Sequence, residues 1–252
     1  MKKVYLSVVA SAYNESENIS RGCLDEMFGY LKKQKYSWEL IIVNDGSSDN
    51  TSELLHKFAD EKKEVKIIDN THQGKASGIL TVGLAAVGEV VLFVDIDQAT
   101  PISEAEKLLE KFNSGFDIVI GSRSGRKGAP LFRQILAYGN VILRTLILRL
   151  PFRDTQCGFK ALTAQAAKKI FTLMRELRPV VTIVGPAVDP GFDVELLYLG
   201  RKFGYKVSEV TVDWHHQETR RVRFFYDMIS GIQGLLTVRW RSITNAYKLN
   251  TN

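Results

Sequence analysis

The sequence predicts an α/β fold in which a mostly parallel sheet is flanked by helices on both faces. Two observations indicate it. Short apolar, β-branched runs alternate four times with helical patterns, and a polar cluster follows most of these runs. The 252 residues are 45% apolar and 25% charged, which is typical of a folded globular protein with a sizeable core. Disordered, collagen-like and disulfide-scaffold classes are therefore excluded.

The first half of the chain contains five predicted strands, each rich in Val, Ile, Leu or Phe. We expect them at residues 4–12, 39–43, 65–69, 90–94 and 116–120. Helices are expected between them, because cap-type residues, a glycine or a proline precede each helical pattern. The first helix runs from the cap residues 14–17 to about residue 31, and the others span residues 51–61, 74–86 and 102–112.

The second half is less regular, and no internal repeat or linker divides it. A long stretch of apolar residues and arginines at helical spacing predicts a helix over 131–150. Beyond it we expect a loop or short strand at 154–160, a helix at 161–177, a proline-rich loop or short strand at 179–190, a helix at 192–203, a strand at 205–214 and helical spacing over 223–247.

The formal net charge of +6 is unevenly distributed. Residues 1–118 sum to −6, residues 119–160 to +7, residues 161–200 to 0 and residues 201–252 to +5. A basic second half predicts an anionic partner. No signal peptide and no apolar stretch of about 20 residues is apparent. Two cysteines without metal-site spacing fit a reducing compartment, so a cytoplasmic location is expected.

Polar clusters lie at the ends of four predicted strands, at residues 13–15, 44–49, 95–97 and 121–123. Ligands of open α/β sheets bind outside the carboxyl ends of the strands. The coincidence of four clusters with four strand ends predicts an active site at this edge.

Asp95 and Asp97 follow a buried-type strand, and carboxylates at i and i+2 there suit one hard cation, Mg²⁺ or Mn²⁺, together with substrate phosphates. A pair of surface carboxylates without a ligand is the alternative. The Asp45 carboxylate could accept hydrogen bonds from a ribose hydroxyl or a base imide. A role as a helix N-cap explains Asp45 or Ser47 equally well. Lys75, after Gly74, suits a phosphate or is simply an exposed lysine.

Six strings occur in order along the chain: VVASAYNE (8–15), IIVNDGSSDNT (41–51), GKASG (74–78), VDIDQATP (94–101), IGSR (120–123) and DTQCGFK (154–160). Together they resemble the family 2 inverting glycosyltransferases, which have the nucleotide-sugar-binding GT-A fold. DTQCGFK, FDVELLYL (192–199) and the tail 227–247 are similar to the dolichyl-phosphate glucosyltransferases and their prokaryotic relatives, the polyprenyl-phosphate branch of the family.

This resemblance implies a GT-A domain over residues 1–222, with a donor-binding half at 1–123 and an acceptor-binding half at 124–222, followed by an amphipathic helical tail at 223–252. It implies metal ligation by Asp95 and Asp97, and catalytic roles for Asp97, Arg123, Asp154 and Arg221. Gln156 and Asp193 would border the acceptor. The nucleotide-sugar would contact Ala12, Tyr13, Asn14, Glu15, Asp45, Gly74, Lys75, Asp95 and Ile96.

The activity that the resemblance implies is inverting, metal-assisted transfer of a hexose from a nucleotide diphosphate sugar to a polyprenyl phosphate. An acceptor phosphate is already largely anionic at pH 7, so positioning and charge stabilisation matter more than a strong base. Arg123 and Arg221 would then hold the acceptor phosphate, and Asp154 would orient an arginine or a hydroxyl. The protein would act as a peripheral protein on the cytoplasmic face of a membrane.

Two departures from the family pattern bear on specificity. Gln98-Ala99-Thr100 after the carboxylate pair is closer to the glucosyl relatives than to the mannosyl ones, which favours UDP-glucose over other donors. Segment 179–190 is longer than the link at this place in the relatives, so the acceptor mouth and the donor hexose stay open.

Several alternatives remain at this stage. A sugar hydroxyl acceptor would need Asp154 or Asp193 as a base, and a non-catalytic nucleotide-sugar-binding protein is a second reading. Glu195 is either a helper of the site or part of a buried polar pair, and the helix over 131–150 is either core or an amphipathic helix in a membrane interface. Nucleic-acid binding is not expected, since the basic segments lack an RNA-binding motif.

Overall fold

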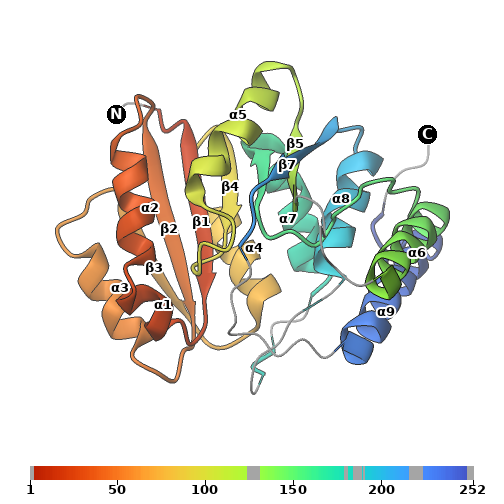
Figure 1. Cartoon of the computed structure of the whole chain (residues 1–252), viewed down its shortest axis with the longest axis horizontal. Coiled ribbons are helices and arrows are strands. Elements are labelled where there is room, and N and C mark those ends of the chain that lie inside the picture. Colours follow the sequence, from red (N-terminus) through yellow and green to blue (C-terminus); the bar gives the residue numbers. More distant parts are fainter. Residues whose placement is uncertain are drawn as a thin grey trace.

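A seven-stranded sheet forms the centre of the computed structural model, with helices on both of its faces (Figure 1). The structure describes residues 3–123, 131–178, 181–183, 189, 191–215 and 224–248. The strand order is β3-β2-β1-β4-β6-β5-β7, and β6 alone among these strands runs antiparallel to its neighbours. The strands are β1 (Leu6–Ala12), β2 (Trp38–Asp45), β3 (Val65–Asn70), β4 (Val90–Val94), β5 (Ile118–Arg123), β6 (Lys160–Thr163) and β7 (Val207–Val212). The α/β fold class is thus confirmed.

The helices follow the strands in the predicted alternation through the first half of the chain and continue through the second. They are α1 (Ser16–Ser20), α2 (Cys23–Lys32), α3 (Thr51–Ala59), α4 (Lys75–Ala85), the 3₁₀ turn η1 (Ile102–Glu104), α5 (Ala105–Asn113), α6 (Leu131–Leu148), α7 (Ala164–Glu176), α8 (Phe192–Lys202) and α9 (Phe224–Ile243).

Two apolar cores lie on opposite faces of the sheet, because side chains alternate along each strand. Val8 packs into the core that holds Leu24 of α2 and Leu108 of α5. Its neighbour Val9 packs into the other core, with Leu80 of α4. That second core extends to α7, α8 and α9, so the C-terminal helix contributes to it.

The predicted bounds of two helices were partly wrong. The helix expected to end at residue 31 is broken into α1 and α2 at Gly22, whose φ of 89° lies in the left-handed region. The helix expected at 161–177 begins only at Ala164, because Lys160–Thr163 forms β6 between β4 and β5. The Thr163 side chain accepts a hydrogen bond from the Ala166 amide and caps α7.

The antiparallel direction of β6 has a direct consequence for the site. Lys160, its first residue, pairs with Phe93 near the end of β4. The loop that leads into β6 therefore reaches the same edge of the sheet as the carboxyl ends of the parallel strands. A parallel strand at this position would have placed that loop at the opposite edge.

Candidate functional site

The four predicted polar clusters all lie at the carboxyl edge of the sheet. Residues 13–15 follow β1, Asn44 and Asp45 end β2, residues 95–97 follow β4, and Arg123 ends β5. Strands β2, β1 and β4 are immediate neighbours, so the first three clusters are adjacent. Loop 154–159 joins them because β6 is antiparallel. The structure thus gathers most of the residues that the sequence singled out.

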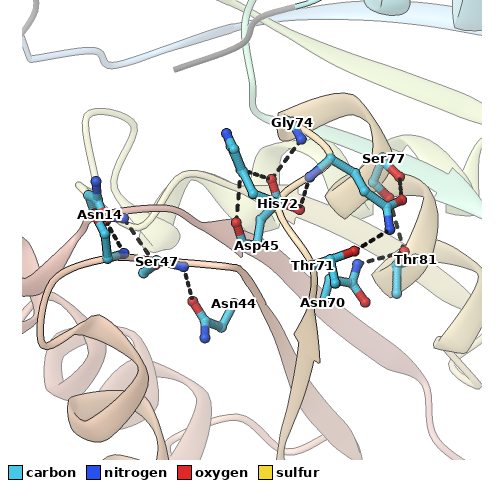
Figure 2. A network of polar contacts seen from close by, with 12 residues as sticks. Asn14, Asn44, Asp45, Ser47, Asn70, Thr71, His72, Gly74, Ser77 and Thr81 are labelled. Carbon is cyan, nitrogen blue, oxygen red and sulfur yellow. Dashed lines mark hydrogen bonds and ion pairs between the residues drawn. The ribbon is translucent and has the colours of Figure 1, made fainter. Parts of the chain in front are cut away.

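Asp45 is completely buried and organises the turn that precedes α4 (Figure 2). Its Oδ1 accepts a hydrogen bond from the Gln73 amide at 3.0 Å, and its Oδ2 accepts one from the Gly74 amide at 2.8 Å. The Nδ1 atom of His72 lies 2.8 Å from the same Oδ2. These bonds exclude the N-cap interpretation of Asp45. The expected contact of Asp45 with a uracil or ribose stays a prediction.

His72 also supports the ring of Tyr13. The two rings are stacked, with 3.9 Å between their centroids and an angle of 11° between their planes. The His72 side chain is only 10% exposed, so the partly exposed Tyr13 ring rests on an almost buried imidazole. No local pattern places His72 in the site, because its partner Asp45 lies 27 residues away.

The first loop is held to the loop after β2 by a set of polar contacts. Asn14 has a φ of 52°, its Oδ1 accepts from the Ser48 amide at 2.8 Å, and its own amide donates to Ser47 Oγ at 3.1 Å. The Glu15 amide donates to Thr51 Oγ1 at 2.8 Å. Figure 2 shows Asn14 and Ser47 side by side at this junction. The Ser47 amide donates to the Asn44 side chain, so N-capping does not explain Ser47 either.

Asp95 and Lys75 form an ion pair at the end of β4, with 2.5 Å between Nζ and Oδ1. Both side chains are about one-third exposed, at 32% and 34%. Asp97 Oδ1 accepts a hydrogen bond from the Ala99 amide at 3.0 Å, which closes a tight turn. Gln98 in that turn has a φ of 51°. Lys75 is therefore a partner of the acidic pair rather than an isolated surface lysine.

Two of the residues expected to contact the nucleotide-sugar, Ala12 and Ile96, have side chains that face the core. Ala12 is completely buried, and Ile96 is 2% exposed. Both belong to the core on the α2 and α5 face of the sheet. Any contact they make with a nucleotide would therefore involve the backbone.

The carboxylates of Asp95 and Asp97 are hard oxygen ligands, and Asp95 is accessible to a ligand. Within the described part of the chain, no group of three or more His, Cys, Asp or Glu side chains is arranged to hold a metal ion. Two carboxylates fit a cation such as Mg²⁺, which usually keeps waters and substrate phosphate oxygens in its shell. The residues present thus fit a metal that shares its coordination with a diphosphate.

Arg123 and Asp154 form a bidentate ion pair. The distances are 2.6 Å from Nε to Oδ2 and 2.8 Å from Nη2 to Oδ1, and the Arg123 amide also donates to Oδ2. Burial opposes ionisation of Asp154, but the hydrogen bonds and charge of Arg123 outweigh it and hold the pKa of Asp154 below its ordinary value. The guanidinium lies 5.7 Å from the centroid of the Trp214 ring. Asp154 is thus placed to orient Arg123, and the catalytic roles expected of both residues stay predictions.

Glu209 of β7 secures the loop that carries Asp154. Its two oxygens accept hydrogen bonds from the amides of Arg153 and Asp154, at 2.9 and 2.8 Å. No sequence pattern pointed to Glu209, since the pairing of β5 with β7 that brings it here is a tertiary feature. The backbone amide of the exposed Gln156 donates a hydrogen bond to Asp154 Oδ1 at 3.2 Å, which completes the turn.

Asp193, in the first turn of α8, pairs with Lys160 at 2.8 Å. Lys160 is almost completely buried, whereas the Asp193 side chain is 28% exposed. No sequence pattern identified Lys160, apart from its place in the DTQCGFK string. The pair joins the start of β6 to α8.

Glu195 has a structural role, as one of the two interpretations held. It is 1% exposed and accepts from Arg241 Nη1 at 2.8 Å and from the Tyr247 hydroxyl at 2.7 Å, while Arg178 Nη1 lies 2.6 Å from its other oxygen. These contacts join α8 to the end of α7 and to the C-terminal segment. Arg221 lies outside the described residues, as do most of residues 179–190.

A parallel-sheet edge with a carboxylate pair, a stacked aromatic ring and a paired arginine is a place where an α/β protein can bind a ligand that contains phosphate. The family is set by comparison with known sequences: residues 7–171 match the family model described as Glycosyl transferase family 2, and the chain belongs to that family.

The chain is similar in sequence to curated proteins named dolichyl-phosphate beta-glucosyltransferase. A dolichyl-phosphate beta-glucosyltransferase of Trichomonas vaginalis is 35% identical over 230 residues, which are 84% of this chain and 64% of that protein. The Homo sapiens dolichyl-phosphate beta-glucosyltransferase is 30% identical over 266 residues, with 97% of this chain and 78% of the relative covered. The chain thus spans somewhat less than two thirds of the Trichomonas relative.

Solved structures confirm the GT-A fold. Glucosyl-3-phosphoglycerate synthase from Mycobacterium tuberculosis, in complex with Mn²⁺ and UDP-glucose, matches with a TM-score of 0.64 and 18% identity, over 94% of this chain and 79% of that one. A mannosyltransferase from Pyrobaculum calidifontis, in complex with GDP-mannose and Mn²⁺, has a TM-score of 0.60 and 17% identity, over 97% and 65%.

Proposed function

We propose that this chain transfers glucose from UDP-glucose to a polyprenyl phosphate such as dolichyl phosphate, with inversion at the anomeric carbon and at a membrane surface. The names of the relatives, dolichyl-phosphate beta-glucosyltransferases, support the acceptor and the sugar. The UDP-glucose in the synthase of similar fold supports the donor.

One structural observation carries the proposal. The loop after β4, at residues 95–97, contacts the loop before β6, at residues 154–159, through Asp95. We call the first the donor loop and the second the acceptor loop, after their proposed roles. A Cβ atom at Gly158 would overlap the Asp95 carboxylate, so the DTQCGFK loop packs directly against it. Lys75 holds the same carboxylate from α4. Because both loops meet at one acidic group, a diphosphate bound there would lie beside the acceptor loop.

Asp95 and Asp97 are the residues proposed to hold Mg²⁺ or Mn²⁺. When bound, the metal neutralises the negative charge that develops on the leaving nucleoside diphosphate. Lys75 adds a positive charge on the same side. Asp97 is oriented by the Ala99 amide, so its carboxylate is fixed before the substrate arrives.

Arg123 is proposed to position the acceptor phosphate. A phosphate monoester has its second pKa near 6 and is largely dianionic at pH 7, so it attacks without a strong base. A guanidinium suits bidentate contacts to phosphate oxygens, and Asp154 restricts this one to a single orientation. Arg221 is proposed as a second phosphate ligand.

The pairing of both candidate bases supports the phosphate acceptor over a sugar hydroxyl. Asp154 is bound by Arg123 and Asp193 by Lys160. A general base needs a pKa near the working pH, whereas the pKa of Asp154 is held below its ordinary value.

The test is a transfer assay with one polyprenyl phosphate acceptor and several labelled donors, UDP-glucose, GDP-mannose and UDP-galactose, with and without Mg²⁺ or Mn²⁺. We expect transfer from UDP-glucose that requires the metal and fails with an oligosaccharide acceptor. Asp97→Ala should lower transfer at least about 100-fold without unfolding the protein. The matched control is Asp25→Ala, an exposed aspartate on α2.

Two outcomes would contradict parts of this proposal. Full activity of Asp97→Ala would overturn the metal assignment. Transfer to a sugar hydroxyl, with none to the polyprenyl phosphate, would overturn the acceptor.

A further inference from the structure

Helices α6 and α9 pack side by side at the edge of the molecule farthest from α2 and α3 (Figure 1). Their inner sides are core: Leu148 on α6, and Leu235 and Val238 on α9, are at most 4% exposed. Both helices are therefore fixed to the domain along one side. Their outer sides have a different composition.

Six of the ten large apolar side chains exposed among the described residues lie on these two helices. Leu146 is 76% exposed and Trp240 is 67% exposed. Spacings of three and four residues place the members on each helix along one stripe. We call this set the apolar stripe: Ile142 and Leu146 on α6, and Ile232, Leu236, Trp240 and Ile243 on α9.

A cavity of about 470 Å³ lies beside the stripe, where α6 and α8 end against α9. Among the described residues, four cationic side chains line it and no acidic one does. We call it the basic pocket, and its cations are Arg149, Arg201, Lys202 and Arg239. Leu146 belongs to both the pocket and the stripe, and Arg239 directly precedes Trp240.

The backbone at the end of α6 is built to present Arg149 here. Arg149 has a φ of 57°, in the left-handed region where glycine or asparagine is favoured. Its amide donates to Thr145 O at 2.9 Å, and its carbonyl accepts from Arg201 Nη1. The Arg201 guanidinium is thus tied to the same turn, so one of the four cations is held in place before any ligand binds, and the backbone that carries Arg149 is fixed as well.

We infer that the stripe and the pocket form a docking surface for a bilayer that contains anionic phospholipid, with a lipid phosphate held in the basic pocket. Guanidinium groups suit phosphate oxygens, and each Lys or Arg close to an anionic leaflet is attracted to its negative surface potential. Exposed Leu, Ile and Trp beside such cations are typical of a surface that enters the membrane interface. A nucleic acid would use the cations but leave the apolar stripe in water.

This pocket is distinct from the strand-end site, because none of its lining residues belongs to that site. The inference rests on the proposed function only in that a lipid acceptor requires contact with a bilayer. No described helix has the length and apolar character to cross a membrane. A peripheral surface of this kind would bring the transferase to its lipid substrate.

The experiment is flotation of the full chain with phosphatidylcholine vesicles, and with vesicles of phosphatidylcholine and phosphatidylglycerol, in both cases without polyprenyl phosphate or sugar nucleotide. We expect binding to the anionic vesicles. The double variant Arg201→Glu, Lys202→Glu should reduce that binding at least about tenfold, because two positive charges near the anionic surface become negative. Trp240→Ser should also weaken it.

The matched control is Lys32→Glu, Lys33→Glu, an exposed basic pair at the end of α2 with the same change in net charge. It should bind within about twofold of the unaltered chain. The far-ultraviolet circular dichroism spectrum and the thermal unfolding of all these variants should match those of the unaltered chain, which shows that they fold.

Absence of binding to anionic vesicles would overturn the inference. Equal losses in the α8 and α2 double variants would also overturn it, since the effect would then be net charge alone. Loss of self-association by Trp240→Ser, with vesicle binding unchanged, would assign the stripe to a second copy of the chain instead. Because the vesicles contain no substrate, these results are independent of whether the proposed transfer reaction is correct.

Discussion

Asp154 holds the guanidinium of Arg123 through two parallel hydrogen bonds, from Nε to Oδ2 at 2.6 Å and from Nη2 to Oδ1 at 2.8 Å. The two residues are 31 positions apart and belong to the two halves that the sequence resemblance implied. The pair is partly exposed, so the arginine is both oriented and accessible. This arrangement identifies Asp154 as a positioning residue for the proposed phosphate-binding arginine.

Replacing Asp154 by Asn keeps the shape of the side chain and removes its charge. We expect kcat/KM for the polyprenyl phosphate to fall about 10- to 100-fold, because a misplaced arginine loses its alignment with the nucleophile. The KM for the sugar nucleotide should change little. Steady-state kinetics with each substrate varied in turn measures this, with Asp60→Asn, an exposed aspartate after α3, as the control. Unchanged kinetics would show that Arg123 needs no partner.

The same pair predicts a pH dependence of stability. The pKa of Asp154 is lower in the folded state than its ordinary value of about 3.9. Its ionisation therefore stabilises the fold at pH values above about 4, and this contribution is lost as the pH falls through the lower, folded-state pKa. The difference in unfolding free energy between the unaltered chain and Asp154→Asn should be constant near neutral pH and shrink in acid. Urea denaturation at several pH values measures it, and a difference that grows in acid would contradict the prediction.

Gly158→Ala tests the contact between the donor and acceptor loops. An added methyl group would overlap the Asp95 carboxylate, so either the loop or the carboxylate must move. We expect transfer to fall at least about tenfold, with a higher metal concentration needed for half-maximal activity. Gly29→Ala on α2 is the control, because a Cβ there meets nothing within 4 Å. Equal activity of the two variants would show that the loops need not touch at Asp95.

We expect the ring of Tyr13 to contribute measurably to the affinity of the protein for the nucleotide. Its ring is fixed by His72, and stacking of aromatic rings contributes about 0.5–1.5 kcal/mol. Tyr13→Ala should weaken binding of UDP by about 2- to 10-fold, and Tyr13→Phe should keep it, since the ring is retained. Isothermal titration calorimetry with UDP measures both. A loss in Tyr13→Phe as large as that in Tyr13→Ala would assign the effect to the hydroxyl.

The contacts of Glu195 predict that the C-terminal segment stabilises the domain. Its removal would leave Arg178 and Arg241 without their buried carboxylate partner. We expect Glu195→Ala to lower the free energy of unfolding by about 3 kcal/mol, and Glu110→Ala, on the exposed side of α5, to change it by less than about 0.5 kcal/mol. Chemical denaturation gives both values, and equal effects would contradict the role of Glu195.

The alternation of strands and helices was readable from the sequence, and so was the position of the site. Runs such as 90–94 have a local apolar pattern that specifies a buried strand whatever its neighbours are. Since parallel strands end at one edge of the sheet, Asp95 and Asp97 were placed there by topology alone. The motif strings added the family, which the comparisons confirmed.

Only the tertiary structure decided which charges meet. The partners of Asp45, Arg123 and Asp193 lie 27, 31 and 33 residues away, and no local pattern encodes such pairing. The helical spacing at 161–163 was overridden because β6 completes the hydrogen bonds of β4 and β5. The sequence thus determined the elements and their chemistry, which depend on neighbouring residues. The packing of distant segments determined the roles of those residues, because hydrogen bonds and ion pairs depend on distances that form only on folding.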